Sequence, residues 1–196
     1  LKGWGDDLSK IKAPLGVYSV LGNHDYGEYT SWKSNEEKNR NFKNLLKAQK
    51  EFGWNLLLNE NDTISVDGNK IKVIGVENWA SSRFQQYGDL DKAYNGLNNE
   101  DFKILMTHNP SHWNAKVTDA YNDIDLTLSG HTHGLQYGID IGDFRVSPVR
   151  LAYKQWADLN ELNKQYIYVN RGFGCMGYPG RVGILPEITI LELKKS

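Results

Sequence analysis

Three short apolar runs, each ending in a polar turn, constrain the fold of this chain more than any other feature. The runs cover residues 17–21, 103–106 and 126–129, and each has the length and composition of a buried strand. The turns that follow them are Gly22-Asn23-His24-Asp25, Thr107-His108-Asn109-Pro110 and Gly130-His131-Thr132-His133. In layered α/β folds the carboxyl ends of strands converge on one edge of the sheet. We therefore expect three turns that are far apart in the sequence to meet in space.

The remaining pattern predicts sheet layers covered by helices. Ser34 and Glu37 form a capping box at the start of a helix of about 18 residues, which Gly53 ends. Strand patterns follow at 55–59, 64–66 and 71–76, at 103–107 and 126–130, and at 135–141, 166–170 and 187–193. A surface loop with a short helix is expected at 85–100, and Pro110 opens a helix. Several strands join directly, so the pattern favours an α/β fold over a simple alternating array.

Bulk composition is that of one ordinary globular domain, residues 1–196. The hydrophobic share is 39% and the net charge is -1, so long-range attraction to nucleic acid or anionic lipid is not expected. A single cysteine, Cys175, excludes an intrachain disulfide and a thiolate-rich zinc site. No apolar run approaches the roughly 18 residues that span a bilayer. The chain begins at Leu1, and we expect it to be cut from a longer protein, so a removed leader or membrane anchor stays open.

Four of the five histidines lie within three residues of a predicted strand end: His24, His108, His131 and His133. Neutral imidazole together with amide or carboxylate oxygen suits Zn²⁺, Mn²⁺ or Fe ions. Gly130 is expected to let the backbone turn so that the two histidines after it face adjacent metals. For one histidine alone, a hydrogen-bonded core or rim position is the commoner alternative. Three such motifs in order favour a metal site.

His112 lies four residues after His108, which suggests a helical pair of zinc ligands. Pro110 between them argues against a shared helical face. We interpret His112 as a surface residue or one that supports the ligands.

The three turns resemble three of the five motifs of the calcineurin-like metallophosphoesterases. The resemblance extends to Ala13-Pro14-Leu15-Gly16-Val17-Tyr18, Asn170-Arg171-Gly172 and Pro186-Glu187-Ile188, which are similar to a bacterial branch that is often membrane-tethered. It implies two packed mixed β-sheets flanked by helices, and metal-dependent hydrolysis of phosphomonoesters or phosphodiesters. By the match of motifs, two divalent ions (Mn, Fe or Zn) share a bridging Asp and a bridging hydroxide. Asn23, His108 and His131 would hold one ion, His133 would help hold the other, and His24 would protonate the leaving oxygen.

Chemistry supports those roles independently of the family. Two metal ions neutralise the phosphate oxygens and lower the pKa of bound water, and an imidazolium beside the leaving oxygen supplies a proton. The chain shows no Cys-His or Ser-His-Asp signature of a covalent nucleophile, which fits water as the nucleophile.

The chain departs from the family pattern at its start. The first two motifs, Asp-x-His and Gly-Asp-x-x-Asp with the bridging carboxylate, are expected before Gly22 and are not present. Gly5-Asp6-Asp7 lies only 17 residues before Gly22, whereas a βαβ unit takes about 30. We therefore expect a fold without its N-terminal strand-helix segment, which binds one ion or none and is inactive by itself. The alternative is a non-catalytic metal- or phosphate-binding module.

Other side chains near the motifs can be interpreted in two ways. Tyr26, Tyr29 and Trp32 form either an aromatic wall over the substrate or ordinary packing. The cations of the later loops either bind phosphate or are solvated, namely Arg145, Arg150, Lys154, Arg171 and Arg181. The motifs leave the substrate open among nucleotides, lipid-linked pyrophosphates and cell-envelope phosphoesters.

Overall fold

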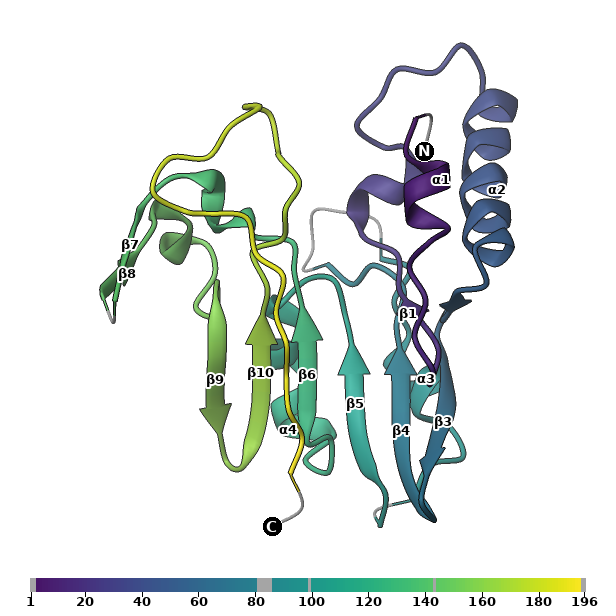
Figure 1. Cartoon of the computed structure of the whole chain (residues 1–196), viewed down its shortest axis with the longest axis vertical. Helices are drawn as coiled ribbons and strands as arrows, with labels where there is room; N and C mark the ends of the chain where they lie inside the picture. The colour runs from purple at the N-terminus through teal and green to yellow at the C-terminus, as the bar shows by residue number, and fades with distance from the viewer. Residues whose placement is uncertain (1–2, 81–85, 99, 143, 195–196) are drawn as a thin grey trace.

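A six-stranded mixed sheet in the order β3-β4-β5-β6-β10-β9 forms the centre of the computed structural model, which describes residues 3–80, 86–98, 100–142 and 144–194 (Figure 1). Its strands are β3 (Glu60–Val66), β4 (Asn69–Gly75), β5 (Phe102–Met106), β6 (Leu126–Ser129), β9 (Asp158–Leu162) and β10 (Gln165–Val169). The four inner strands are parallel, and the edge strands β3 and β9 are antiparallel to their neighbours. The carboxyl ends of β5 and β6 therefore lie at the same edge of the sheet.

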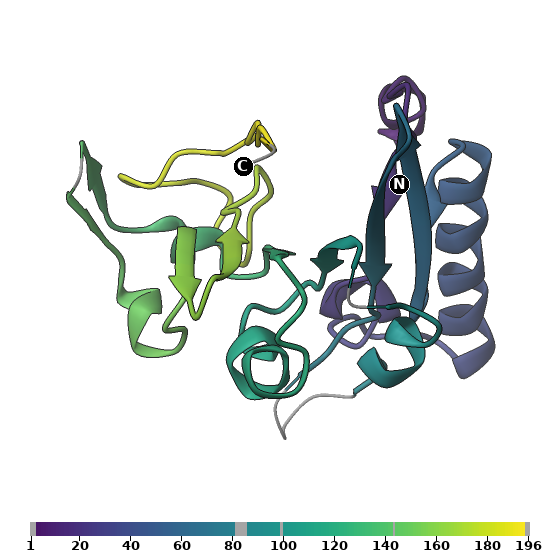
Figure 2. The same ribbon diagram turned by 90° about the horizontal axis from the view of Figure 1, so that it is seen from below.

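Two short helices and a π-helical turn cover one face of this sheet, whereas the long helix stands beside its β3 edge and the first helix lies toward the opposite face (Figures 1 and 2). The structure has α1 (Gly5–Leu8), α2 (Asn35–Glu51), α3 (Leu90–Tyr94) and α4 (Thr118–Ala120), the last preceded by a π-helical turn η2 (Trp113–Val117). The predicted capped helix is confirmed as α2, because Ser34 Oγ accepts a hydrogen bond from the Glu37 backbone N–H at 3.3 Å. Gln49 is the one buried residue of α2, and the rest of the helix is exposed or half-buried.

The hydrophobic core lies between α3, η2, α4 and the sheet. Its buried members come from both layers: Ile74, Val76, Leu90, Ala93, Leu105, Trp113, Val117, Tyr121, Ile124, Ile167 and Val169. Burial of apolar area of this kind stabilises the fold by about 25 cal/mol per Å². One charged side chain, Lys103, is also fully buried on β5, and its Nζ lies 3.0 Å from a carboxylate oxygen of Asp123. The sheet and its helical cover thus form one rigid support for the turns at the strand ends.

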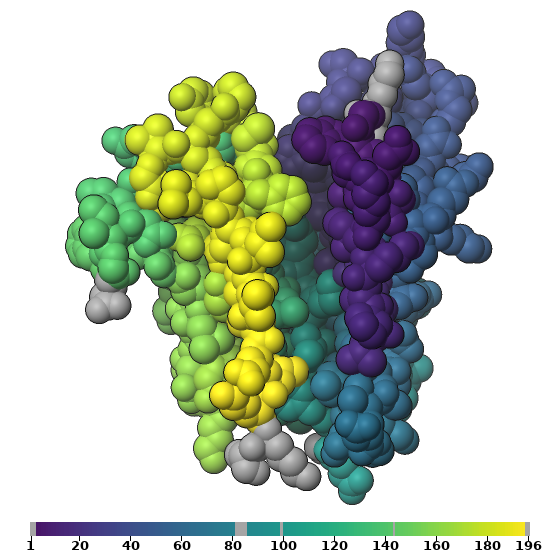
Figure 3. All heavy atoms as spheres, in the orientation of Figure 1, coloured from purple at the N-terminus to yellow at the C-terminus, as the bar shows by residue number. Residues whose placement is uncertain are grey.

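The opposite face carries extended segments. Residues 185–194 run along the front of the sheet, and a hollow separates them from the N-terminal segments in the space-filling view (Figure 3). The strand predicted at 187–193 is wrong, since the residues form no ladder with a described strand, and Ile188 and Ile190 are 86% and 94% exposed. The strand predicted at 17–21 is present in shortened form as β1 (Tyr18–Ser19), which pairs in parallel with β2 (Asn55–Leu56).

A small arm projects from the other end of the sheet (Figure 2). It contains the antiparallel pair β7 (Ile139–Ile141) and β8 (Phe144–Val146), followed by the 3-10 turn η4 (Pro148–Leu151). The strand predicted at 135–141 is wrong in its first half, because residues His133–Gln136 form the 3-10 turn η3. Strands β8 and β9 have no counterpart among the predicted strands.

Candidate metal centre

Three donor atoms from three separate turns meet at the carboxyl edge of the sheet. Asn23 Oδ1 lies 2.9 Å from His108 Nε2 and 3.1 Å from His131 Nδ1, and the two ring nitrogens are 3.1 Å apart. Asn23 stands in the 3-10 turn η1 (Asn23–Tyr26) after β1, and the histidines follow β5 and β6. The structure therefore brings these three predicted residues together.

The triangle of donors fits a first-row divalent cation. Tetrahedral ligands at about 2.1 Å from an ion lie about 3.4 Å from one another, whereas ligands at the right angles of an octahedral site lie about 3.0 Å apart. The three measured separations, 2.9, 3.1 and 3.1 Å, agree with that spacing. Two imidazole nitrogens and one amide oxygen are ligands that Zn²⁺, Mn²⁺ and Fe ions accept.

Two tyrosines contact the outer sides of two of these donor residues. Tyr153 Oη lies 2.7 Å from His131 Nε2, and the amide Nδ2 of Asn23 donates to Tyr29 Oη at 2.9 Å. These contacts leave His131 Nδ1 and Asn23 Oδ1 on the inner side. Partners behind a ligand in this way fix its orientation and, for histidine, its tautomer. The sequence did not single out Tyr153, because 22 residues separate it from its partner.

His108 and His131 are neutral near pH 7. Burial, together with the neighbouring histidines, lowers the pKa of His108 to about 3 and that of His131 to about 4. Burial and the charge of Arg181 also lower the pKa of His133. Neutral imidazoles carry a free lone pair, so these rings can bind a cation without first losing a proton.

The backbone of the third turn, residues 130–133, is strained. His131 and His133 have φ values of 70° and 51°, in the left-handed region that costs non-glycine residues on the order of 1–3 kcal/mol each. The expectation that Gly130 supplies the turn is wrong, because the left-handed conformations begin one residue later. The sheet and the loops around it hold this conformation, and strain of this kind is concentrated at functional sites.

His133 lines the same pocket, of about 350 Å³, as Asn23, His108 and His131, but it stands outside their triangle. Its Nδ1 is buried and has no hydrogen-bond partner within the described part of the chain. An unpaired buried nitrogen beside the triangle is a group that a second ligand or ion would satisfy.

His24 and Asp25 lie at the rim of this pocket. The His24 ring is exposed and stacks on Tyr29 with 4.4 Å between centroids. The Asp25 carboxylate accepts a hydrogen bond from the Gly22 N–H at 2.7 Å, and burial raises its pKa. Among residues 3–80, 86–98, 100–142 and 144–194, no three His, Cys, Asp or Glu side chains form a metal-binding group. The triangle therefore depends on the amide of Asn23.

His112 is not a surface residue, which corrects one of its two predicted positions. It is fully buried, its Nδ1 lies 3.1 Å from Thr107 Oγ1, and its ring stacks on Trp79. Burial, with the charge of Lys116, lowers its pKa to about 3. Through Thr107 it supports the turn that carries His108.

Of the three aromatic candidates, Tyr29 lines a pocket at the histidines. Tyr26 is buried and stacks on Tyr87 and Phe42. Trp32 donates its indole N–H to the Gly27 carbonyl at 2.8 Å. Ordinary packing thus accounts for Tyr26 and Trp32.

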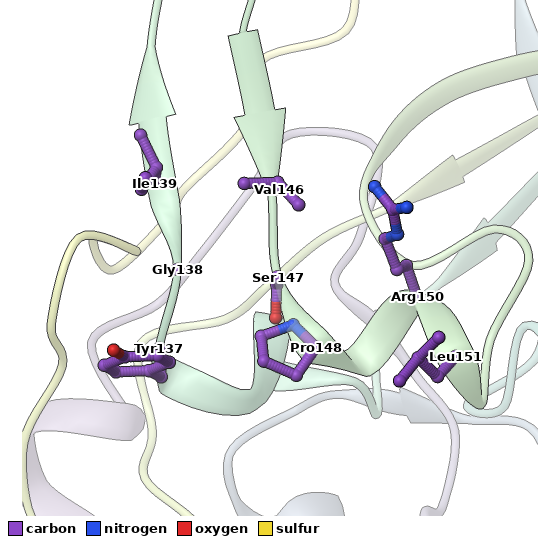
Figure 4. A pocket seen from close by; sticks show the side chains of 8 residues that line it. All are labelled: Tyr137, Gly138, Ile139, Val146, Ser147, Pro148, Arg150 and Leu151. Carbon is purple, nitrogen blue, oxygen red and sulfur yellow. The ribbon is translucent and has the colours of Figure 1, made fainter.

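Most arginines of the later loops bind other groups of the protein. Arg145 and Arg171 both pair with Asp140, and Arg181 donates to the backbone carbonyls of Arg171 and Gly174. Arg150 lines a separate hollow of about 410 Å³ on the β7–β8 arm (Figure 4). None of the predicted metal ligands lines this hollow. The donor triangle therefore stands apart from these cations.

The comparisons with known proteins agree with the motifs. The family model for calcineurin-like phosphoesterases matches residues 2–135. The chain is 31% identical over 191 residues to "Uncharacterized metallophosphoesterase YkuE" of Bacillus subtilis, covering 96% of this chain and 60% of that protein. It is 28% identical over 191 residues to "Phosphodiesterase YaeI" of Escherichia coli, covering 97% and 63%. A "Transmembrane protein with metallophosphoesterase domain" of Bos taurus is 30% identical, with 96% and 41% covered.

The solved structure of the Haemophilus influenzae NAD nucleotidase aligns with a TM-score of 0.46 and 21% identity, over 79% of this chain and 33% of that one. The chain spans about 60% of the length of the Bacillus subtilis relative. Some relatives are named as transmembrane proteins, whereas no helix in the described ranges of this chain is long and apolar enough to cross a bilayer. By the match of its family model, the chain belongs to the calcineurin-like phosphoesterase family.

Proposed function

We propose that this chain carries the metal site of a phosphoester hydrolase that acts on phosphomonoesters or phosphodiesters. The observation that carries the proposal is the convergence of Asn23 Oδ1, His108 Nε2 and His131 Nδ1 within 3.1 Å of one another. These three side chains would hold one divalent ion, Mn, Fe or Zn, and His133 would contribute to a second. When bound, such ions neutralise phosphate oxygens and make hydroxide available near neutral pH.

The chain's own residues have separate tasks in this proposal. His24 is exposed at the pocket rim, where its ring can reach the leaving oxygen and give it a proton. Its stacking on Tyr29 fixes the plane of the ring. Tyr29 and Tyr153 keep the ligand atoms turned inward before any ion arrives.

Metal binding and turnover are measured separately, to distinguish a hydrolase from a non-catalytic module. Calorimetry with Mn²⁺ and Zn²⁺ is carried out on residues 1–196, and hydrolysis of p-nitrophenyl phosphate and bis-p-nitrophenyl phosphate on the full reading frame that contains them. His131→Ala is expected to weaken metal binding at least tenfold, because it removes one of three ligands. His24→Ala is expected to keep metal binding and to reduce turnover by about 10²-fold or more.

Two outcomes would contradict the proposal. Metal binding that His131→Ala leaves unchanged would show that the triangle is not the site. Metal binding without hydrolysis of either ester by the full reading frame would favour the non-catalytic metal- or phosphate-binding module.

A further inference from the structure

The β7–β8 arm carries an exposed apolar face. Its two strands pair Ile139 with Val146, Asp140 with Arg145, and Ile141 with Phe144. Because side chains alternate between the faces of a strand, the two apolar pairs lie on one face of the hairpin and the charged pair lies on the other. On the apolar face, Ile139, Ile141 and Phe144 are 46%, 73% and 63% exposed. Exposed apolar patches of this kind mark sites of interaction.

The charged face of the hairpin turns toward the body of the molecule. Asp140 pairs with Arg171, which follows β10, and Arg145 pairs with Asp158, the first residue of β9. The Asp140 and Arg171 side chains are only 18% and 11% exposed. The apolar face therefore points away from the sheet, and the charges behind it have partners.

The base of the arm is fixed against the loop that follows β10. The Gly138 N–H donates to the Val182 carbonyl at 3.0 Å, and the Val182 N–H donates to the Gln136 carbonyl at 2.8 Å. A Cβ added at Gly138 would lie 2.3 Å from the Val146 carbonyl oxygen, so the chain segments meet closely there. The exposed face is thus held in one orientation before any partner arrives.

Side chains with an apolar body and a polar end lie at the base of this face. A hollow of about 410 Å³ is present there, and its lining includes Tyr137, Arg150 and Leu151 (Figure 4). Tyr137 is 60% exposed and Leu151 is 88% exposed. Tyrosine and arginine suit the headgroup level of a bilayer, because the ring or stem stays in apolar surroundings while the polar end reaches water and phosphate. The apolar members of the whole surface, which we call the arm face, are Tyr137, Ile139, Ile141, Phe144, Val146 and Leu151.

The size of the arm face argues against a protein partner. Its six residues compare with the roughly 20–30 residues that each side contributes to a stable protein–protein interface. A bilayer needs no matching surface, because apolar side chains that project far enough enter the boundary between headgroups and acyl chains. Arg150 beside the face supplies a positive charge for lipid phosphates.

We propose that the arm face docks on the surface of a lipid bilayer, with Ile141 and Phe144 inserted below the headgroups and Arg150 at the level of the phosphates. The residues that make this contact belong to this chain, so the contact is separate from any anchor elsewhere in a longer protein. The net charge of -1 gives no attraction to a membrane from a distance, so apolar insertion supplies most of the binding. The inference does not depend on the proposed function.

Sedimentation with sucrose-loaded vesicles measures the binding of residues 1–196. The chain is expected to bind vesicles of phosphatidylcholine, and to bind about fivefold more tightly when phosphatidylglycerol is mixed in, which is the contribution of one cation near an anionic surface. Arg150→Gln is expected to remove this preference and to leave binding to phosphatidylcholine unchanged. Ile141→Thr combined with Phe144→Thr is expected to weaken binding to both kinds of vesicle about 100-fold, about tenfold for each apolar side chain. Threonine keeps the β-branched shape that strands accept.

Leu162→Thr is the matched control. Leu162 is 43% exposed and ends β9, about 13 Å along the strand from Asp158, which pairs with the arm. Its replacement is expected to leave binding unchanged. Leu151→Ser replaces a residue of η4 outside the hairpin and is expected to weaken binding about tenfold. This second arm variant tests the proposal without altering the strands.

A nitroxide label reports insertion directly. Cys175 is the one cysteine of the chain, so Cys175→Ser with Ile141→Cys gives a single labelling site. With vesicles present, a label at position 141 is expected to become more accessible to oxygen and less accessible to a water-soluble nickel chelate. A label introduced by Leu162→Cys in the same background is expected to stay in water.

Three results would overturn the inference: no binding to either kind of vesicle, equal affinity in wild type and in both arm variants, or a label at position 141 that stays in water. A dimer seen by sedimentation equilibrium without lipid, and lost in the double variant, would also overturn it, because the arm face would then belong to a contact between two copies of the chain. Metal binding and hydrolysis are expected to be the same in wild type and arm variants. Failure of the proposed function and failure of this inference are therefore separate results.

Discussion

The phenol of Tyr153 lies 2.7 Å from Nε2 of His131, on the side of the ring opposite the nitrogen that faces Asn23 and His108. The two rings meet edge to face, 5.3 Å apart. When Nε2–H donates to the phenol oxygen of Tyr153, the lone pair of Nδ1 points toward the triangle of donors. Tyr153 is therefore a positioning residue for one donor of the triangle.

Tyr153→Phe removes the hydroxyl and keeps the ring. We expect Mn²⁺ or Zn²⁺ to bind about 10- to 100-fold more weakly, as is usual when the partner behind a histidine ligand is lost. Calorimetry gives the affinity. The ¹⁵N chemical shifts of the His131 ring in the metal-free protein report its tautomer, which is expected to change from a single form to a mixture.

Tyr137→Phe is the matched control, since Tyr137 is 60% exposed and lies in the arm segment. Equal metal affinities in wild type, Tyr137→Phe and Tyr153→Phe would show that the hydroxyl does not orient His131.

Gly22 is required because of the His108 ring. A Cβ added at Gly22 would lie 2.8 Å from three ring atoms of His108, whereas one added at Gly130 would meet its nearest neighbour at an ordinary 3.7 Å. We expect Gly22→Ala to displace the ring and to weaken metal binding at least tenfold, and Gly130→Ala to leave it nearly unchanged. Calorimetry on both variants checks this, and the reverse order of affinities would contradict it.

Buried His112 makes stability depend on pH. Its pKa is about 3 in the native state and about 6.5 in the unfolded chain, so the unfolded state binds more protons between these values. Stability is fully present above pH 6.5 and falls as the pH drops toward 3. The contribution lost between pH 7 and pH 4 is on the order of 3 kcal/mol. Urea unfolding of wild type and His112→Gln at both pH values measures it.

In His112→Gln that part of the pH dependence is expected to be absent, although the variant is less stable at pH 7. A free energy of unfolding that falls equally in both proteins between pH 7 and pH 4 would show that His112 takes up its proton without unfolding.

Arg171 links the C-terminal segment to the sheet. Its Nε donates to Glu187 Oε2 at 2.6 Å, and its guanidinium also pairs with Asp140. Burial opposes the ionisation of Glu187, but hydrogen bonds from Tyr168, Arg171 and Thr189 outweigh it and hold the pKa of Glu187 at about 2. Stability from Glu187 is present above pH 4.5 and is lost as the pH falls toward 2.

Arg171→Met is expected to raise the pKa of Glu187 and to lower the free energy of unfolding at pH 7 by about 3 kcal/mol. Urea unfolding at pH 7 and pH 3 measures both effects. Lys194→Met removes an exposed pair with Glu192 and is expected to change stability by less than about 0.5 kcal/mol. Equal losses in the two variants would mean that Arg171 does not anchor the segment.

Local patterns predicted the elements whose partners are close in the sequence. The cap at Ser34 depends on neighbouring residues, and α2 begins where that pattern places it, while β3 and β4 overlap the strands predicted at 64–66 and 71–76. The strand at 187–193 failed because an apolar alternation does not state whether a neighbouring strand is available. The pairing of strands depends on tertiary structure, and within the described residues no strand pairs with this segment.

The same distinction applies to the site. The strand-end positions of Asn23, His108 and His131 can be read from the sequence because parallel strands have a common direction. The position of Tyr153 cannot, since it acts through a contact between loops whose course no local pattern fixes. The strained backbone at His131 could likewise not be predicted from the sequence. A histidine adopts a left-handed conformation only when the surrounding structure holds it there.

The donors of the triangle come from turns separated by 85 and 23 residues along the chain. An unfolded polypeptide with donors so widely spaced offers a cation no two neighbouring donors of the triangle, so under the proposed function metal binding would follow assembly of the parallel strands. The ion would then stabilise the folded structure without directing its folding. Refolding rates should consequently be insensitive to added Zn²⁺, while unfolding rates decrease.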